Sequence, residues 1–171
     1  TVRDENISRA LNYFSNWNFN FTKNDIPTAL FHVFFQHLMH TIYADEMGEQ
    51  LFGQYIYLAN MPYRVTLALL ASPNAEWFDD VTTPQHETRD DIIRKSMDET
   101  IHELQQKFGS EMKEWRWGKL HTLTINHVFG SRKPLDVIFN IGPFELGGSG
   151  TTLNNGEYSF VKPYTVTLGP S

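Results

Sequence analysis

Apolar residues repeat every three to four positions through the first 110 residues of the chain, and this spacing is typical of helices. The pattern predicts five helices, over 5–15, 24–47, 51–60, 63–71 and 88–108. In the second helix, apolar groups cover more than one face, which predicts burial on two sides. The loop after the fourth helix holds Trp77 and Phe78, which we expect to anchor that loop in the core.

Polar and glycine residues mark the ends of these helices. Asn24 or Asp25 can cap the second helix, and Pro27 suits its first turn, where the missing N–H would have no partner anyway. Gly48 is a predicted left-handed cap for the same helix. Gly109 is the predicted stop of the fifth helix.

The fifth helix has the clearest local signals. Thr88 and Asp91 fit a capping box in which Asp replaces Glu. Asp91 with Lys95, and Glu103 with Lys107, are charge pairs four residues apart in the favourable order, each stabilising the helix by only about 0.3 kcal/mol.

From about residue 120 the spacing changes to alternation, with many β-branched residues. Strands are predicted over 120–129, 137–141 and 164–168. Helices followed by a few strands predict an α+β fold, predominantly helical in residues 1–110, with short strands and glycine turns in 118–170. We expect a single domain over 1–171, with a helical part at about 4–110. Three short strands are few for an independent sheet, so we expect them to lean on structure outside this chain.

Composition narrows the possible functions. The chain has 171 residues, of which 40% are hydrophobic, enough for one domain with a packed core. Its net charge of −6 and lack of a long basic run argue against binding to nucleic acid. The absence of cysteine excludes disulfides, thiolate metal sites and a cysteine nucleophile. No run approaches the roughly 20 apolar residues of a membrane span.

Five histidines are candidates for chemistry. His37 and His40 lie three apart in the second predicted helix and, with His32, could serve a zinc site. No His-Glu-x-x-His pattern is present, and histidines at the rim of a helix interface are the preferred interpretation. His121 and His127 are six apart in a predicted strand and therefore on one face. A general base there is possible, but structural hydrogen bonding is preferred.

Two further features resemble known sites. The run Gly147-Gly148-Ser149-Gly150 lacks the following Lys of a phosphate loop, so glycines that permit positive φ in a tight turn are preferred. Thr1 could act as a nucleophile with its own α-amine as base. However, the charged terminal segment after it does not offer the rigid position that a nucleophile needs. The residues alone therefore predict no catalytic, cofactor or metal site.

The stretch from Trp115 to Asn154 carries a family resemblance. Its motifs are Trp117-Gly118-Lys119-Leu120-His121, His127-Val128-Phe129-Gly130, Gly142-Pro143, Gly147-Gly148 and Thr152-Leu153-Asn154. They resemble the C-terminal part of the β-chain in the penicillin amidase (penicillin acylase) family. The resemblance is specific over about residues 95–160 and only positional over residues 1–90.

This resemblance implies an N-terminal nucleophile hydrolase that cleaves amide bonds in penicillins, cephalosporins or acyl-homoserine lactones. It also implies a periplasmic or secreted enzyme, with calcium possible in the whole protein. The family's nucleophile, oxyanion Asn and calcium carboxylates lie upstream of the matched region. We therefore expect a non-catalytic structural fragment, inactive alone and without a cofactor, whose partner is the rest of the parent chain. The start at Thr1 and the end just after a strand-like run fit that expectation.

Two expectations complete this picture. If the strands are cut from their neighbours, their unpaired edges should allow self-association through residues 120–129 or 164–168. The alternative to a hydrolase fragment is an independent helical ligand-binding or protein-interaction domain.

Overall fold

The structure is a computed structural model. It describes residues 2–58, 60–150, 152 and 165–168. The chain forms two compact units. A helical unit comprises residues 1–15 and 30–110, and a β-containing unit comprises residues 16–29 and 111–171. The loop before the second helix thus belongs with the strands, although the sequence pattern groups it with the helices. A single domain over 1–171 stays a prediction.

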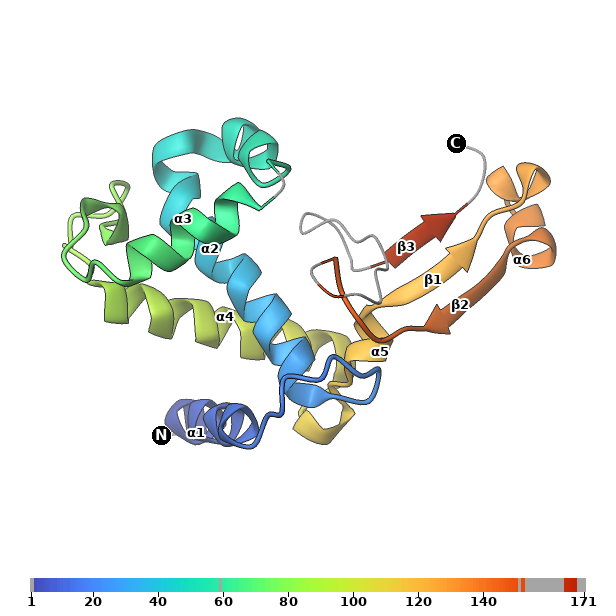
Figure 1. The fold of residues 1–171 in the computed structure, drawn as a ribbon, viewed down its shortest axis with the longest axis horizontal. Coiled ribbons are helices and arrows are strands. Elements are labelled where there is room, and N and C mark those ends of the chain that lie inside the picture. The colour runs from blue at the N-terminus through green and yellow to red at the C-terminus, as the bar shows by residue number, and fades with distance from the viewer. Residues whose placement is uncertain (1, 59, 151, 153–164, 169–171) are drawn as a thin grey trace. The chain divides into compact units, whose positions relative to one another are not determined.

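The helical unit contains the predicted helices with small changes at their ends (Figure 1). The elements are α1 (Val2–Ser15), α2 (Ile26–Tyr55), α3 (Met61–Leu70), the 3₁₀ turn η1 (Glu76–Phe78) and α4 (Arg89–Phe108). Within α2, Gly48 has φ 70° and ψ 156°, outside the helical region. Gly48 therefore interrupts the helix as predicted, but its extended ψ means that it is not the predicted left-handed cap. The two predicted helices on either side of it are the two halves of α2.

Buried side chains lie on more than one face of α2, as its sequence predicts, and together with those of α4 they form the core of the helical unit. Its fully buried side chains include Leu30, Val33, Leu38, Met39 and Ile42 from α2, and Ile92 and Leu104 from α4. Phe78 is also buried, so the predicted loop anchor is confirmed for this residue. Trp77 is 39% exposed and its ring lies 5.6 Å from that of Tyr43. The anchor is therefore Phe78, and Trp77 covers the outside.

Helix α4 begins and ends as its sequence predicts. The Thr88 side chain accepts from the Asp91 amide and the Asp91 carboxylate accepts from the Thr88 amide, which completes the capping box. Gly109 follows with φ 84°. The Glu103–Lys107 pair forms at 2.7 Å. The predicted Asp91–Lys95 pair is wrong: Asp91 is held by its cap, and Lys95 lies 3.3 Å from Asp80 instead.

The β-containing unit combines a small sheet with short helices (Figure 1). Its elements are the 3₁₀ turn η2 (Met112–Glu114), α5 (Trp117–Leu120), β1 (Thr122–Ile125), the 3₁₀ turn η3 (Val128–Ser131), α6 (Leu135–Phe139), β2 (Ile141–Glu145) and β3 (Thr165–Leu168). The strand order is β2-β1-β3. Strand β1 pairs antiparallel with β2 and parallel with β3. The α+β class is confirmed.

Two predicted strands differ from the structure. The strand predicted over 120–129 is only Thr122–Ile125, since Leu120 ends α5 and Val128 begins η3. The strand predicted over 137–141 is mostly helix α6, and the real strand β2 follows it. Short apolar runs do not distinguish a strand from a helix by spacing alone. Pro143 lies inside β2, where it is tolerated because β2 is an edge strand.

The strand order also corrects the expected route to self-association. Strand β1 is central and uses both of its backbone edges, so residues 120–129 do not offer a free edge for a second chain. The edges of this sheet are β2 and β3.

Across the part of the chain that the structure describes, no helix combines the length and apolarity needed to cross a bilayer.

Candidate functional site

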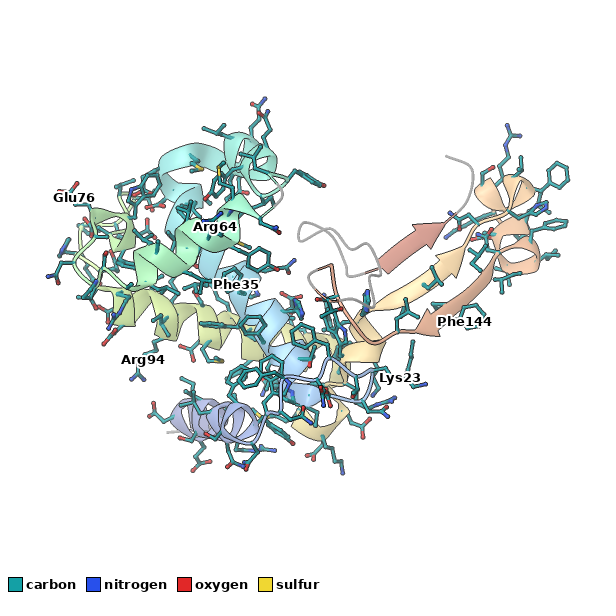
Figure 2. The ribbon with its side chains drawn as sticks, viewed as in Figure 1. Lys23, Phe35, Arg64, Glu76, Arg94 and Phe144 are labelled. Carbon is teal, nitrogen blue, oxygen red and sulfur yellow. The ribbon has the colours of Figure 1, made fainter. Side chains whose placement is uncertain are left out.

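The residues that carry the family resemblance meet at one corner of the β-containing unit. Helix α5 starts there, and the loop before α2 holds its first turn. The Trp117 amide donates to the Asp25 carbonyl at 2.9 Å, and the Gly118 amide donates to the Lys23 carbonyl at 2.7 Å. Lys23 is labelled in Figure 2. The free amides that begin every helix thus find backbone partners 90 or more positions earlier in the chain.

The Trp117 side chain is the centre of this corner. It is completely buried, and its indole Nε1 donates to the Gly148 carbonyl at 2.8 Å. Its ring stacks on His121, with centroids 5.0 Å apart and planes 24° apart. The Gly148 amide in turn donates to the Phe21 carbonyl at 2.6 Å. Three segments distant in sequence are therefore joined through one tryptophan.

The glycines of the corner permit close backbone approach. A Cβ on Gly118 would lie 2.9 Å from the Lys23 carbonyl oxygen, and one on Gly147 would lie 2.8 Å from the Phe21 carbonyl oxygen. Both distances are too short for any side chain. Gly148 has φ 76°, a conformation that favours glycine. The glycine run is thus a packing element. This agrees with the preferred interpretation of the run as a tight turn and not as a phosphate-binding loop.

The corner is closed by polar contacts. The Arg116 guanidinium lies 3.3 Å from each carboxylate oxygen of Glu145 and donates to the Asn24 side chain at 3.0 Å. The Ser149 amide donates to the Thr152 hydroxyl at 2.8 Å. The last two residues of the Thr152-Leu153-Asn154 motif lie outside the described residues, as does the candidate nucleophile Thr1.

The two histidines predicted on one strand face are separated in the structure. His121 directly follows α5 and is buried beneath Trp117. His127 lies beyond the end of β1, is exposed, and uses Nδ1 to accept from the Phe129 amide at 3.2 Å. The same-face prediction is wrong because β1 ends at Ile125, before the alternation reaches His127. They do not form a shared acid–base pair.

His37 of the helical unit has close carboxylate partners and a raised pKa. It projects from α2 between two glutamates of α4, with Nε2 2.8 Å from Glu103 and Nδ1 3.3 Å from Glu99. Burial disfavours its charged form, but hydrogen bonds and charge from both glutamates outweigh burial and raise the pKa of His37 to about 9. The hydrogen bond to His37, with a further hydrogen bond and charge from Lys107, outweighs burial and lowers the pKa of Glu103 to about 2. The preferred interpretation, a histidine at a helix interface, is confirmed for His37.

This ion pair predicts a pH-dependent stability of the helical unit. The raised pKa of His37 means that its contribution is complete below about pH 6.5 and is lost between pH 6.5 and 9. The lowered pKa of Glu103 means that the contribution is present above about pH 4.5 and is lost as the pH falls towards 2. Counting the pair once and allowing for solvent screening, it contributes about 1–2 kcal/mol between those limits.

Urea unfolding at pH 6 and pH 9.5 tests this prediction. The parent chain should lose stability at the higher pH, and His37→Gln should be less stable at pH 6 and lose less on going to pH 9.5. The control is His102→Gln, since His102 is exposed on α4 and contacts Gln106. Identical pH profiles for the parent chain and His37→Gln would contradict the assignment.

An acidic pocket of about 320 Å³ lies in the helical unit. Its lining consists of His40, Thr41, Ala44, Asp45, Glu49, Asp80, Thr82, Lys95 and Glu99. Several of these polar groups pair with one another: His40 with Glu49 at 2.8 Å, Lys95 with Asp80 at 3.3 Å, and the Thr82 hydroxyl with Asp80 at 2.6 Å.

Beside this pocket, burial together with the hydrogen bond and charge of Asp45 raises the pKa of Glu46 to about 7. Sequence reasoning missed the cluster because its members come from three separate segments of the chain, and no short motif links them. Among the residues that the structure describes, no three His, Asp or Glu side chains are placed to hold a metal ion.

Comparison with known proteins matches the whole described chain to one family. Residues 2–171 match the family model for penicillin amidase. The chain is 28% identical over 166 residues to the acyl-homoserine lactone acylase QuiP of Pseudomonas aeruginosa, covering 88% of this chain and 20% of that protein. It is 30% identical over 151 residues to the protein of the same name from Pseudomonas syringae pv. syringae, covering 83% of this chain and 18% of that protein. The chain thus spans about a fifth of the length of these relatives, and it belongs to the penicillin amidase family.

Proposed function

We propose that this chain is a structural part of an N-terminal nucleophile hydrolase that cleaves linear amide bonds of acylated substrates. The observation that carries the proposal is the Trp117 corner. The motif residues that resemble the family are used there for packing: the indole binds Gly148, the ring stacks on His121, and Gly118 contacts Lys23. A tryptophan and glycines held in this way shape a scaffold and leave the bond-breaking step to groups elsewhere in the enzyme.

The names of the relatives indicate which substrates to test for the whole enzyme. They are named acyl-homoserine lactone acylases, so an acyl-homoserine lactone is the first substrate to test, and a β-lactam with an acylated amine is the second. Both present the same bond, a linear amide between an acyl group and an amine. The family resemblance adds a periplasmic or secreted location and calcium bound outside this chain.

The first test is activity of the chain alone. Purified residues 1–171 should release no amine from phenylacetyl amides or acyl-homoserine lactones, because the proposal places the nucleophile and its α-amine base outside this chain. The complete hydrolase carrying this chain should release amine from at least one of them. Amine release is followed with a fluorogenic amine reagent, with heat-denatured protein as the blank. Turnover by the pure 171-residue chain, or an open reading frame that starts near Thr1, would refute the proposal.

The acidic pocket supports a second candidate, an independent ligand-binding domain. Its volume of about 320 Å³ lies at the lower end of the range for small-molecule sites. The two candidates make opposite predictions for the isolated chain. A ligand-binding domain should bind a small amine or cation in calorimetry and lose that binding in Asp45→Asn. A structural part of a hydrolase should show no such binding.

A further inference from the structure

The end of the β1–β2 hairpin exposes apolar side chains in an unusual concentration. Over residues 125–144, the exposed fraction is 84% for Val137, 69% for Ile138, and 63% for both Val128 and Phe129. Ile141, at the start of β2, is also exposed. Phe144, labelled in Figure 2, is exposed too but pairs with Leu123 towards the other end of the strands. We call Val128, Phe129, Val137, Ile138 and Ile141 the hairpin-tip surface. Figure 1 shows η3 and α6 at the end of the two strands.

The hairpin-tip surface belongs to one local structure. Ile125 of β1 pairs with Ile141 of β2, and Leu123 pairs with Phe144. The rings of Phe129 and Phe139 lie 5.9 Å apart, which joins η3 to α6. None of the five residues of α6 is buried, and every residue of β2 is exposed. The apolar side chains thus come from three adjoining elements.

Physical chemistry makes this arrangement costly for a free surface. A five-residue helix is far too short to be stable in water without packing partners, because nucleation is unfavourable. Large contiguous apolar patches on soluble proteins usually mark a contact site. Leaving Val137, Ile138 and Phe129 largely exposed forfeits the favourable free energy of burying their apolar surface. A covering surface would recover that free energy and hold α6 in place.

We propose that the hairpin-tip surface docks against an apolar surface in the rest of the same hydrolase polypeptide. This inference rests on the proposed function. The length of the relatives supports this choice of occupant: the chain covers only 20% and 18% of their lengths, so about four fifths of such a protein lies outside it. The range matched to the family, residues 2–171, includes the hairpin.

The charge around the tip agrees with a protein partner. Arg132 and Lys133 lie in sequence between the apolar groups, and Asp136 follows them. These three charges sum to a net charge of +1. A polar rim around an apolar centre is the usual build of a protein interface.

Thiol labelling tests this docking directly, since the chain contains no cysteine of its own. Val137→Cys places one thiol at the most exposed position of the surface. Lys113→Cys is the matched control, at an exposed position of η2 in the same unit. The rate of maleimide labelling is measured for both variants in the 171-residue chain and in the complete hydrolase, with the modified peptide identified by mass spectrometry. Hydrogen exchange over 128–141 in the unmodified protein gives a readout without mutation.

The expected result is labelling of the Val137→Cys thiol at least ten times slower in the complete hydrolase, with the Lys113→Cys rate changed by less than twofold. Equal Val137→Cys rates in the two proteins, together with fast hydrogen exchange over 128–141, would overturn the proposal. Protection in the isolated chain that grows with its concentration would also overturn it and indicate a second copy. Protection that appears only with phosphatidylglycerol vesicles would overturn it in favour of a membrane.

Amide turnover is measured on the same preparations, which separates this inference from the proposed function. Turnover with a fully reactive Val137→Cys thiol would reject the docking and keep the activity. A protected thiol in a complete protein without turnover would keep the covered surface and reject the activity.

Discussion

Replacing Trp117 with alanine should destabilise the β-containing unit by about 4 kcal/mol, the cost of deleting a large buried aromatic side chain. Trp117 is completely buried and lies against His121. Removing it leaves a cavity, and it also removes the donor that satisfies the Gly148 carbonyl. Since small domains are stable by only about 5–15 kcal/mol, this loss should remove a large share of the unit's stability.

Two variants separate the causes of that loss. Trp117→Phe keeps an aromatic ring but removes the indole donor, so it should lose about 1–3 kcal/mol, mainly from an unsatisfied Gly148 carbonyl. Trp77→Ala is the control for tryptophan removal, because Trp77 is partly exposed in the helical unit. Trp77→Ala should lower the stability of the β-containing unit, measured by hydrogen exchange, by about 1 kcal/mol or less.

Hydrogen exchange with mass spectrometry measures these effects locally. In Trp117→Ala, peptides covering 116–148 should lose protection, while peptides from α4 should change much less. The order of destabilisation should be Trp117→Ala, then Trp117→Phe, then Trp77→Ala. If Trp117→Ala retained the parent's protection over 116–148, Trp117 could not be the centre of the corner.

The helices could be predicted from sequence because their signals are local. At the start of α4, Thr88 and Asp91 each accept a hydrogen bond from the other's amide. At its end, Gly109 follows the last helical residue with a positive φ. Residues next to each end therefore determine where α4 begins and stops. Gly48 likewise breaks α2 through its own backbone conformation. Lys95 shows the limit of this approach: its position relative to Asp91 is ideal, yet a loop residue 15 positions away, Asp80, is its partner. Exposed ion pairs contribute little, so such choices follow from the tertiary fold.

The strands were harder to predict because the structure uses tertiary contacts to define them. The run Val137-Ile138-Phe139 suits a strand by composition but forms α6, and the real strand contains Pro143. Strand β1 ends after four residues, which separates His121 from His127. The contacts of the Trp117 corner join positions 21–25, 117–121 and 147–148. No spacing rule connects such distant segments. The resemblance pointed to 117–121 and 147–148, and nothing in the sequence pointed to 21–25 as their partner.

Gly142→Ala should be the most damaging of the glycine substitutions, with a loss of about 3 kcal/mol. Gly142 in β2 has φ 116°, which strains any side chain. A Cβ there would lie 2.5 Å from the Leu123 carbonyl oxygen of the central strand and 3.3 Å from the Thr124 Cα. Both neighbours are backbone atoms of a paired strand, so they cannot move aside as a flexible side chain would. The change should therefore separate β2 from β1.

Substitutions at two other glycines separate the effect of backbone strain from the effect of a steric clash. Gly109 has φ 84° but open space around it, so Gly109→Ala should lose only about 1 kcal/mol, from strain alone. Gly53 lies in the helical part of α2 with open space around it, so Gly53→Ala should gain about 0.5–1 kcal/mol from helix propensity. Each variant is compared with the parent by urea unfolding and by exchange in its own unit. A Gly142→Ala loss no larger than that of Gly109→Ala would mean that β1 and β2 can separate at that point without cost. In that case the hairpin would not hold its tip in a fixed position for docking.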